Sequence, residues 1–570
     1  MTKGTGDRPQ TGQRREPGSV PSYREAYEGF RWNVPADFNI AVAACGRWSG
    51  ERQRLALYWE DESGETRALS YWDLQQAANR LSNALAALGV ARGDRVALIL
   101  PQRPEMVITY LAVFQMGAVA VPLSFLFGPE ALEYRLGDSG AKVAVVDPAT
   151  WANLEPARVR LVDLAHVIGV AGARAPGMLD WDATLAKAAR RFDPVATRAV
   201  DPAAIIYTSG TTGPPKGALL PHSALLGNLP GFEHSHDGFP QEGDLFWSPA
   251  DWAWTGGLWD ALMPTLYHGC AILGYRGRFD AERAFHLLEK YQVRNAFLFP
   301  TALKMMMKAV PHPRSRYDVN LRSLMSGGEP VGAAVFHWCR DELGVTVNEI
   351  FGQTEMNYIV GNSHTVWPVK PGSMGRPYPG HCIAVIDDAG RELGPGEVGD
   401  VAVRRTWIDG TPDPVFFLGY WGNAAATEKK YSGEWCRTGD QASMDGDGYL
   451  WYQGRSDDMF KSAGYRIGPA EIENCLVKHA AVANCAVVPS PDEMRGAVIK
   501  AFVLLVPGQT ASEALKDSIR AHVKAHLAPY QQPREIEFVS ELPMTTTGKV
   551  QRKVLREREA EKFGSPTARG

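Results

Sequence analysis

The sequence is poor in cysteine, in excess charge of either sign and in long uncharged runs. Seven cysteines are scattered over 570 residues without a Cys-x-x-Cys pair, which argues against a disulfide framework or zinc knuckle and favours a reducing, cytoplasmic compartment. A formal net charge of −4 gives no sign of a nucleic-acid or anionic-membrane partner. Residues 107–127 lack charge over nearly the length of a membrane span, but they include Gly117 and Pro122. We interpret them as a buried helix followed by a strand and predict no membrane span.

The remaining pattern predicts an α/β protein with more than one domain, because the chain is too long for one ordinary core. Residues 70–88 have apolar side chains at helical spacing, and strands are expected at 95–100 and 143–146. Strands that alternate with helices are typical of parallel sheets. Residues 371–454 instead show short alternating runs between Asp-Gly and Pro-Gly turns, which predicts a β-rich subdomain.

The domain boundaries follow from these changes in pattern. We predict a flexible tail at 1–29, an N-terminal domain at 30–456, a small α+β C-terminal domain at 457–562 and a second tail at 563–570. The N-terminal domain is expected to hold two α/β subdomains and, from about residue 371, the β-rich subdomain.

A run of hydroxyls, glycines and one lysine follows the strand expected at 203–207. In this loop, glycines let backbone N–H groups turn inward around an anion, and Lys216 adds a positive charge. It is not a Walker A loop, because Lys216 lies between a proline and a glycine. A flexible surface turn is the alternative, but a turn needs no hydroxyl run with a lysine. The candidate phosphate-binding residues are Thr208, Ser209, Gly210, Thr211, Thr212, Gly213 and Lys216.

Six further motifs occur in order along the chain. They are Ser326-Gly-Gly-Glu-Pro330, Phe351-Gly-Gln-Thr-Glu355, Arg437-Thr-Gly-Asp440, Gly454-Arg-Ser-Asp-Asp458, Gly464-Tyr-Arg-Ile-Gly468 and Pro543-Met-Thr-Thr-Thr-Gly-Lys549. With the phosphate loop, they resemble the superfamily of AMP-forming acyl-CoA synthetases, luciferases and peptide-synthetase adenylation domains, from about residue 30 to 560. The resemblance is nearest to the medium-chain acyl-CoA synthetase group. It implies a large adenylate-forming domain, a small mobile C-terminal lid, and the substrates ATP, a small carboxylic acid and coenzyme A.

The resemblance also implies a role for each nucleotide-site motif. Thr354 would contact the α-phosphate and Glu355 would hold Mg²⁺, while the phosphate loop takes the β- and γ-phosphates. Asp440 and Arg455 would bind the ribose. The adenine would face the turn at Gly328, Glu329 and Pro330 and stack on Phe351, and Gly352 and Gln353 of the same motif as Phe351 would also contact the nucleotide. A structural turn residue is the alternative for Glu329. Taken alone, Glu355 would be a solvated surface acid, and Thr-Gly-Asp is a common turn.

The lid is expected to serve two reactions in turn. Lys549 would reach the carboxylate and α-phosphate for adenylation, where negative charge accumulates. Asp457 would be the hinge that then presents Gly464 and Arg466 to coenzyme A for thioester formation. A solvated helix start is the alternative for the basic residues that follow Lys549.

The acid-binding pocket is expected around residues that are small or aromatic. By resemblance they are Trp254, Thr255, Gly256, Gly327 and Gly352. Acetyl-specific relatives have a tryptophan where this chain has Gly352, so the sequence predicts room for a medium-chain, branched or aromatic acid. Buried packing is the alternative for any one tryptophan. Transfer to a carrier protein, and an inactive nucleotide-binding relative, are the alternative functions.

Overall fold

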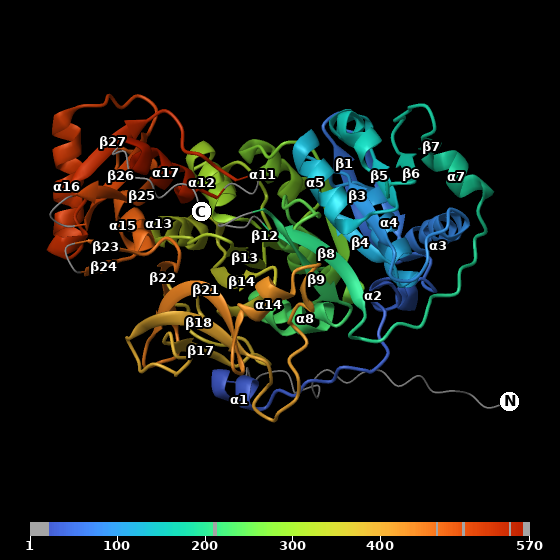
Figure 1. Ribbon diagram of the computed structural model, residues 1–570, viewed down its shortest axis with the longest axis horizontal. Coiled ribbons are helices and arrows are strands. Elements are labelled where there is room, and N and C mark those ends of the chain that lie inside the picture. The colour runs from blue at the N-terminus through green and yellow to red at the C-terminus, as the bar shows by residue number, and fades with distance from the viewer. Residues whose placement is uncertain (1–21, 209–213, 463–464, 493–495, 546–548, 563–570) are drawn as a thin grey trace.

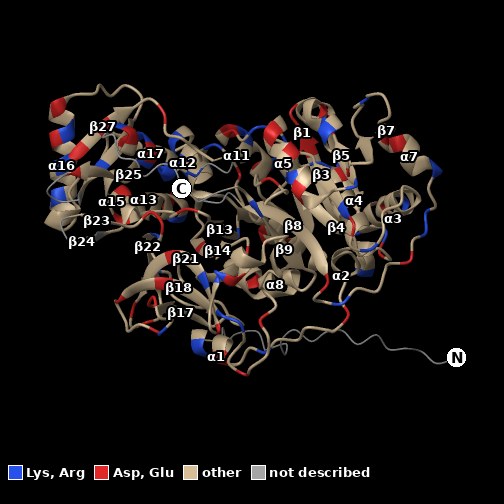
Figure 2. Cartoon of the chain, viewed as in Figure 1, with Lys and Arg blue, Asp and Glu red and all other residues tan. Residues whose placement is uncertain are grey.

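The computed structural model describes residues 22–208, 214–462, 465–492, 496–545 and 549–562. Two large sheets, an antiparallel sheet and a small C-terminal domain make up this part of the chain (Figure 1). The C-terminal domain lies at one end of the molecule, and the sheet that contains β3–β7 lies towards the other. Acidic and basic residues are interspersed on outer helices such as α5 and α16 (Figure 2).

The first large sheet has eight strands and is mainly parallel. Its order is β19 (Gly419–Tyr420), β9 (Lys216–Pro221), β8 (Pro202–Thr208), β4 (Val119–Pro122), β3 (Arg95–Ile99), β5 (Val143–Val146), β6 (His166–Gly169) and β7 (Leu179–Asp180). The strands predicted at 95–100, 143–146 and 203–207 are confirmed, and β3 pairs in parallel with both β4 and β5. Between β8 and β9 the chain reverses, so the phosphate loop lies at the end of an antiparallel pair.

The second large sheet has nine strands with antiparallel strands at both edges. Its order is β16 (Arg376–Pro377), β15 (Met356–Gly361), β14 (Val347–Gln353), β13 (Ser323–Gly327), β12 (Asn295–Phe297), β10 (Leu245–Trp247), β11 (Ala271–Arg276), β1 (Leu55–Asp61) and β2 (Thr66–Ser70). The parallel strands β13 and β14 end next to each other, which brings two predicted nucleotide motifs to one edge of the sheet.

Helices lie around and between these sheets. They are α1 (Tyr23–Glu28), α2 (Ile40–Ala44), α3 (Tyr71–Ala87), α4 (Pro104–Gln115), α5 (Pro129–Ser139), α6 (Pro148–Leu154), α7 (Trp181–Lys187), α8 (Ala224–Ser235), α9 (Thr255–Gly257), α10 (Met263–Tyr267), α11 (Ala281–Lys290), α12 (Pro300–Ala309), α13 (Ala333–Trp338), α14 (Ala424–Glu428), α15 (Pro469–Leu476), α16 (Glu513–His526) and α17 (Arg552–Lys562). A π-helical turn, η3 (Leu258–Leu262), joins α9 to α10.

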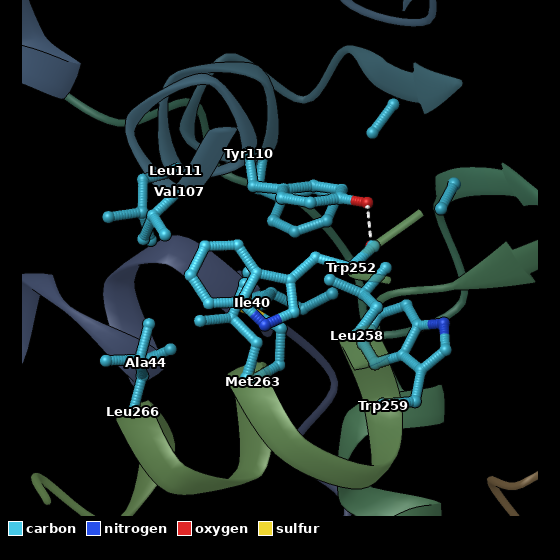
Figure 3. Close-up of a cluster of buried hydrophobic side chains, with 14 of the residues drawn as sticks. Ile40, Ala44, Val107, Tyr110, Leu111, Trp252, Leu258, Trp259, Met263 and Leu266 are labelled. Carbon is cyan, nitrogen blue, oxygen red and sulfur yellow. Dashed lines mark hydrogen bonds between the residues drawn. The ribbon is translucent and has the colours of Figure 1, made fainter. Parts of the chain in front are cut away.

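One hydrophobic core joins the two large sheets through α3, α4 and α8. Every residue of α4 is buried, and Tyr110 on it donates a hydrogen bond to the Trp252 carbonyl at 2.7 Å (Figure 3). The uncharged run at 107–127 is thus the predicted helix and strand, α4 and β4. None of the helices in the described ranges is long and apolar enough to cross a membrane.

The predicted β-rich subdomain is an antiparallel sheet of five strands. They are β17 (Ile383–Ile386), β18 (Val398–Arg404), β21 (Trp435–Met444), β20 (Tyr431–Ser432) and β22 (Leu450–Arg455). The flexible tail predicted to residue 29 is wrong for Tyr23–Glu28, because these residues form α1 against this region. Tyr23 Oη donates to the Pro377 carbonyl at 3.0 Å, and Tyr27 Oη donates to the His381 carbonyl at 2.8 Å.

The C-terminal domain begins after β22 and has a core of its own. A three-stranded sheet, β25 (Val482–Asp492), β26 (Gly496–Leu505) and β27 (Glu535–Val539), packs against α15 and α16. A two-stranded ribbon, β23 (Phe460–Ser462) and β24 (Tyr465–Ile467), joins it to β22. Separate hydrophobic contacts of this kind allow a domain to move as a unit.

Candidate functional site

The stem of the phosphate loop lies beside an aromatic ring from a distant segment. Thr208 ends β8 and pairs with Lys216 at the start of β9. The Lys216 ammonium lies 5.3 Å from the centre of the Tyr420 ring, within the range of a cation–π contact. The loop residues Ser209, Gly210, Thr211, Thr212 and Gly213 lie outside the described residues.

Thr354 and Glu355 form the turn between β14 and β15, on the same side of the site as Tyr420. Glu355 is buried, and its Oε1 accepts a short hydrogen bond from Tyr420 Oη. The Lys430 ammonium lies 3.9 Å from the same oxygen. A buried carboxylate beside the stem of the predicted phosphate loop offers the kind of oxygen ligand that Mg²⁺ uses together with phosphate oxygens and water. Tyr420 and Lys430 belong to no recognised motif, so the sequence analysis missed both.

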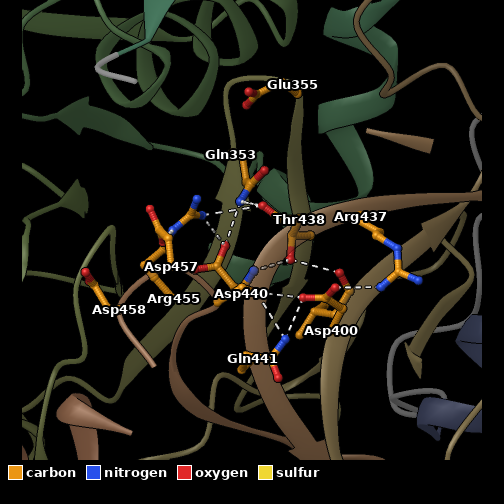
Figure 4. Close-up of polar contacts among 12 residues, drawn as sticks. Gln353, Glu355, Asp400, Arg437, Thr438, Asp440, Gln441, Arg455, Asp457 and Asp458 are labelled. Atoms are coloured by element: carbon orange, nitrogen blue, oxygen red, sulfur yellow. Dashed lines mark hydrogen bonds and ion pairs between the residues drawn. The ribbon is translucent and has the colours of Figure 1, made fainter. Parts of the chain in front are cut away.

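Asp440 is the centre of a polar network that connects three motifs (Figure 4). Its Oδ2 accepts from Gln353 Nε2 at 2.6 Å and from Arg455 Nη1 at 3.1 Å. Burial raises the pKa of the Asp440 carboxyl, and the guanidinium of Arg455 opposes that rise. Tyr452 Oη lies 3.4 Å from Oδ1. The second oxygen is therefore held only weakly by protein and is free to accept from a diol.

The Gly328 turn lies opposite this network, and the lid reaches it. Gly328 has φ +87°, a conformation that side chains disfavour, and Thr301 Oγ1 donates to Glu329 at 3.1 Å, which keeps that side chain at the end of β13. A Cβ at Gly328 would lie 3.9 Å from Cε of Lys549. The positive charge of Lys549 also helps lower the pKa of Asp440. Residues more than 200 positions apart thus converge on one site.

Two adjacent acidic residues in the linker form ion pairs with different domains. Asp457 accepts from Arg455 Nε at 3.4 Å, on the large-domain side. Asp458 instead pairs with Arg552 at 3.3 Å and with Arg556, both on α17 of the C-terminal domain. A change in backbone direction at this point would move Lys549 and its domain together, as expected of a hinge.

Residues 247–259 contain four tryptophans, and most of these side chains are buried in the core. Trp247, Trp252 and Trp259 are fully buried, so the packing alternative is confirmed for these three. Trp254 is half-buried and meets the Phe127 ring edge-on at 5.7 Å between centroids. It is the tryptophan of residues 247–259 that keeps part of its surface exposed.

The glycines predicted to enlarge the acid site are packed closely. A Cβ at Gly352 would lie 2.6 Å from the Tyr358 amide nitrogen, and one at Gly327 would lie 2.8 Å from Ile350. Glycine at 352 is therefore required by a close backbone approach. Space for extra carbons at the acid site stays a prediction. A Cβ at Gly256 would lie 3.0 Å from Phe297, so an aromatic ring lies beside this glycine.

A buried polar pair lies behind these glycines. Asn357 Nδ2 donates a short hydrogen bond to Asp260 of η3, and both side chains are buried. Burial raises the pKa of Asp260 to about 7, although the bond from Asn357 opposes the rise. Sequence reasoning missed this pair because Asp260 follows a tryptophan-rich run and has no motif of its own.

The residues predicted to serve coenzyme A are less completely placed. Gly464 lies outside the described residues, and Arg466 is described only as part of β24, where it pairs with Lys461.

Phe351 is half-buried on β14, opposite Val360 of β15. Its exposed face lies at the edge of the sheet where adenine is expected.

Comparison with known proteins identifies the family. A model of the AMP-binding enzyme family matches residues 47–421, and one of the AMP-binding enzyme C-terminal domain matches residues 471–549. An uncharacterised acyl-CoA ligase of Bacillus subtilis is 35% identical over 530 residues, covering 92% of this chain and 97% of its own. An acetyl-coenzyme A synthetase of the same organism is 34% identical, covering 94% and 95%.

Solved structures agree with the sequence relatives. The anthranilate CoA ligase AuaEII, crystallised with anthranoyl-AMP, is 30% identical and has a TM-score of 0.84, covering 93% of this chain and 99% of its own. Its match includes both the large domain and the lid, as do those of the relatives above. The chain therefore belongs to the AMP-binding enzyme family and is an AMP-forming acyl-CoA synthetase, an ATP-dependent acid–thiol ligase.

Proposed function

We propose that this ligase activates an acid with an apolar chain or an aromatic ring, using Lys549 for adenylation and the Asp457 hinge between its two steps. The observation that supports it best is the convergence of Lys549 with the Gly328 turn and Asp440. In the first step, an oxygen of the substrate carboxylate bonds to the α-phosphorus of ATP and pyrophosphate leaves. Both reactants are anions, so a positive charge placed between them lowers the barrier.

The nucleotide would be held by groups at both ends. The Asp440 carboxylate and Arg455 suit the ribose hydroxyls, and Phe351 offers a flat face for adenine beside the Gly328 turn. Thr354 would donate to the α-phosphate from the turn before Glu355. The phosphate loop would hold the outer phosphates through its backbone N–H groups and Lys216.

Mg²⁺ would be held by Glu355 together with phosphate oxygens. Burial of the carboxylate, with Tyr420 and Lys430 orienting only one of its oxygens, supports this assignment. When bound, the ion would neutralise the charge of the pyrophosphate leaving group. With one carboxylate oxygen oriented in this way, the other oxygen of Glu355 would be offered to the ion.

In the second step, the thiolate sulfur of coenzyme A bonds to the acyl carbon and AMP leaves. Rotation at Asp457 would withdraw Lys549 and present the β24 region with Gly464 and Arg466. The separate ion pairs of Asp457 and Asp458 support a hinge at this point, because one anchors the linker to each domain. A cytoplasmic location remains a prediction.

The acid would lie against the half-buried ring of Trp254 and near the buried Phe297. Each CH₂ buried on these surfaces would contribute about 0.8 kcal/mol, so longer apolar acids should bind better until the site is filled. One relative is named an acetyl-coenzyme A synthetase and another an anthranilate CoA ligase, so family membership alone does not select the acid. The aromatic residues near the proposed acid site of this chain support the choice.

The test is acid-dependent exchange of labelled pyrophosphate into ATP across acetate, C4–C10 fatty acids, benzoate and anthranilate. We expect exchange to be strongest with an acid larger than acetate, and AMP release to require coenzyme A as well. Trp254→Ala should raise the KM for the preferred acid more than the KM for acetate. Exchange strongest with acetate, or equal effects of Trp254→Ala on both acids, would contradict the proposed acid class.

A further inference from the structure

A cysteine and two histidines gather on the C-terminal domain, away from the residues assigned to the acyl-CoA synthetase reaction. Cys475 lies near the end of α15, and His522 and His526 lie on α16. Each of the three offers a ligand atom, and these atoms lie within 4.8 Å of one another. His522 and His526 are four residues apart, so both imidazoles leave the same face of the helix. The helices that carry them pack against each other in the domain core.

The hydrogen bonds of the histidines fix which nitrogen is available in each ring. His522 Nε2 lies 3.1 Å from the Cys475 carbonyl, and His526 Nδ1 lies 2.7 Å from the His522 carbonyl. A carbonyl oxygen only accepts, so both of these nitrogens carry protons. Nδ1 of His522 and Nε2 of His526 are then left with lone pairs. A ring N–H held by a backbone carbonyl is the usual arrangement around a metal-bound histidine.

We propose that Cys475, His522 and His526 form a binding site for a divalent transition metal, with Zn²⁺ as the natural occupant. One thiolate and two imidazoles form a borderline-soft donor set that suits Zn²⁺ and Co²⁺ and does not suit Mg²⁺. Three protein ligands leave a fourth tetrahedral position for water. Cys475 is buried, His522 is half-buried and His526 is exposed, so the metal ion would enter from solvent past His526.

The ligand atoms must move closer together to hold a metal ion. Zinc at about 2.3 Å from sulfur and about 2.1 Å from nitrogen requires ligand atoms roughly 3.4–3.6 Å apart. The ligand atoms now lie within 4.8 Å of one another, so they must approach by about 1 Å, with each histidine presenting the nitrogen that keeps its lone pair. Binding replaces the Cys475 proton with the metal and releases that proton to solvent. The bound ion would cross-link α15 to α16 in the lid.

A nearby histidine supplies a matched control. The His479 ring is centred 5.5 Å from that of His522, but both of its nitrogens are engaged. Nδ1 accepts from the Ala481 amide at 3.2 Å, and Nε2 lies 3.1 Å from Ser518 Oγ. His479→Gln should therefore leave metal affinity nearly unchanged, whereas His526→Gln removes a ligand.

The test is titration of the untagged, reduced full-length protein with Co²⁺ and then Zn²⁺, monitored by absorption. We expect one Co²⁺ per chain, with a sulfur-to-metal charge-transfer band that Zn²⁺ abolishes. Cys475→Ser should lose the band, and His526→Gln should weaken binding at least about 100-fold, beyond the 10–100-fold typical of an outer-sphere partner. Pyrophosphate exchange and melting temperature of the metal-free variants should match the wild type. Absence of the band, its survival in Cys475→Ser, or an equal loss in His479→Gln would overturn the proposal.

Discussion

Replacement of Asp440 by asparagine isolates the charge that the ribose is proposed to meet. The amide keeps the shape of the carboxylate, and its oxygen can still accept from Gln353 and Arg455. Hydrogen bonds to a charged group contribute about 1.5–3 kcal/mol and neutral ones about 0.5–1.5 kcal/mol. For two ribose hydroxyls the loss is about 2–3 kcal/mol, which predicts a rise of about 30–150-fold in the KM for ATP.

The assay is pyrophosphate exchange at varied ATP, with Asp400→Asn as the matched control. Asp400 belongs to the same network but accepts from Arg437 at 2.6 Å. Because burial raises the pKa of Asp440 against the effect of Arg455, the wild-type KM should also rise as the pH falls, and the variant should lose that dependence. An unchanged KM in Asp440→Asn with an intact fold, or an equal rise in both variants, would refute the ribose assignment.

Three further predictions concern the surroundings of the site. Tyr420→Phe removes the hydrogen bond to Glu355 and should raise the Mg²⁺ concentration for half-maximal exchange about 10-fold, since loss of a group that orients a metal ligand typically costs about 10–100-fold in metal affinity; an unchanged requirement would contradict the metal assignment. Burial raises the pKa of Asp260 to about 7, so its native state binds a proton more tightly and its contribution to stability falls as the pH rises from about 4 to about 7. In Asp260→Asn, the urea midpoint of unfolding should change less with pH over this range. A variant whose midpoint changes with pH as the wild type's does would disprove the pKa shift. Gly352→Ala should cost about 1–3 kcal/mol of stability through its clash with the Tyr358 amide, and an unchanged melting temperature would show that the backbone relaxes.

The elements that sequence patterns predicted well are those with local causes. The helix after Ser70 begins with the expected capping box, and the buried strand at 143–146 follows from an unbroken apolar run. The helix at Tyr23–Glu28 could not be foreseen, because its stability depends on contacts with residues about 350 positions later. Short polar segments have no core-facing stripe to reveal them.

The site residues that belong to sequence motifs could be predicted, and those placed only by tertiary contacts could not. Asp440 and Lys549 belong to recognisable motifs, and the positive charge of Lys549 acts on the Asp440 carboxyl in the structure. Tyr420 and Lys430 act on Glu355 only through tertiary contacts, so nothing in their neighbouring residues indicates a role. The need for glycine at 352 likewise comes from a tertiary contact, because the Tyr358 amide approaches it closely.

The most direct test of the two-step account separates the half-reactions in Lys549→Ala. Pyrophosphate exchange should fall by several orders of magnitude, because the charge that meets the α-phosphate is lost. Conversion of supplied acyl-AMP and coenzyme A to acyl-CoA should stay within a few-fold of the wild type, because Lys549 is withdrawn when the lid turns. If both half-reactions fall equally in a folded variant, Lys549 does not act in adenylation alone and the account of the lid is wrong.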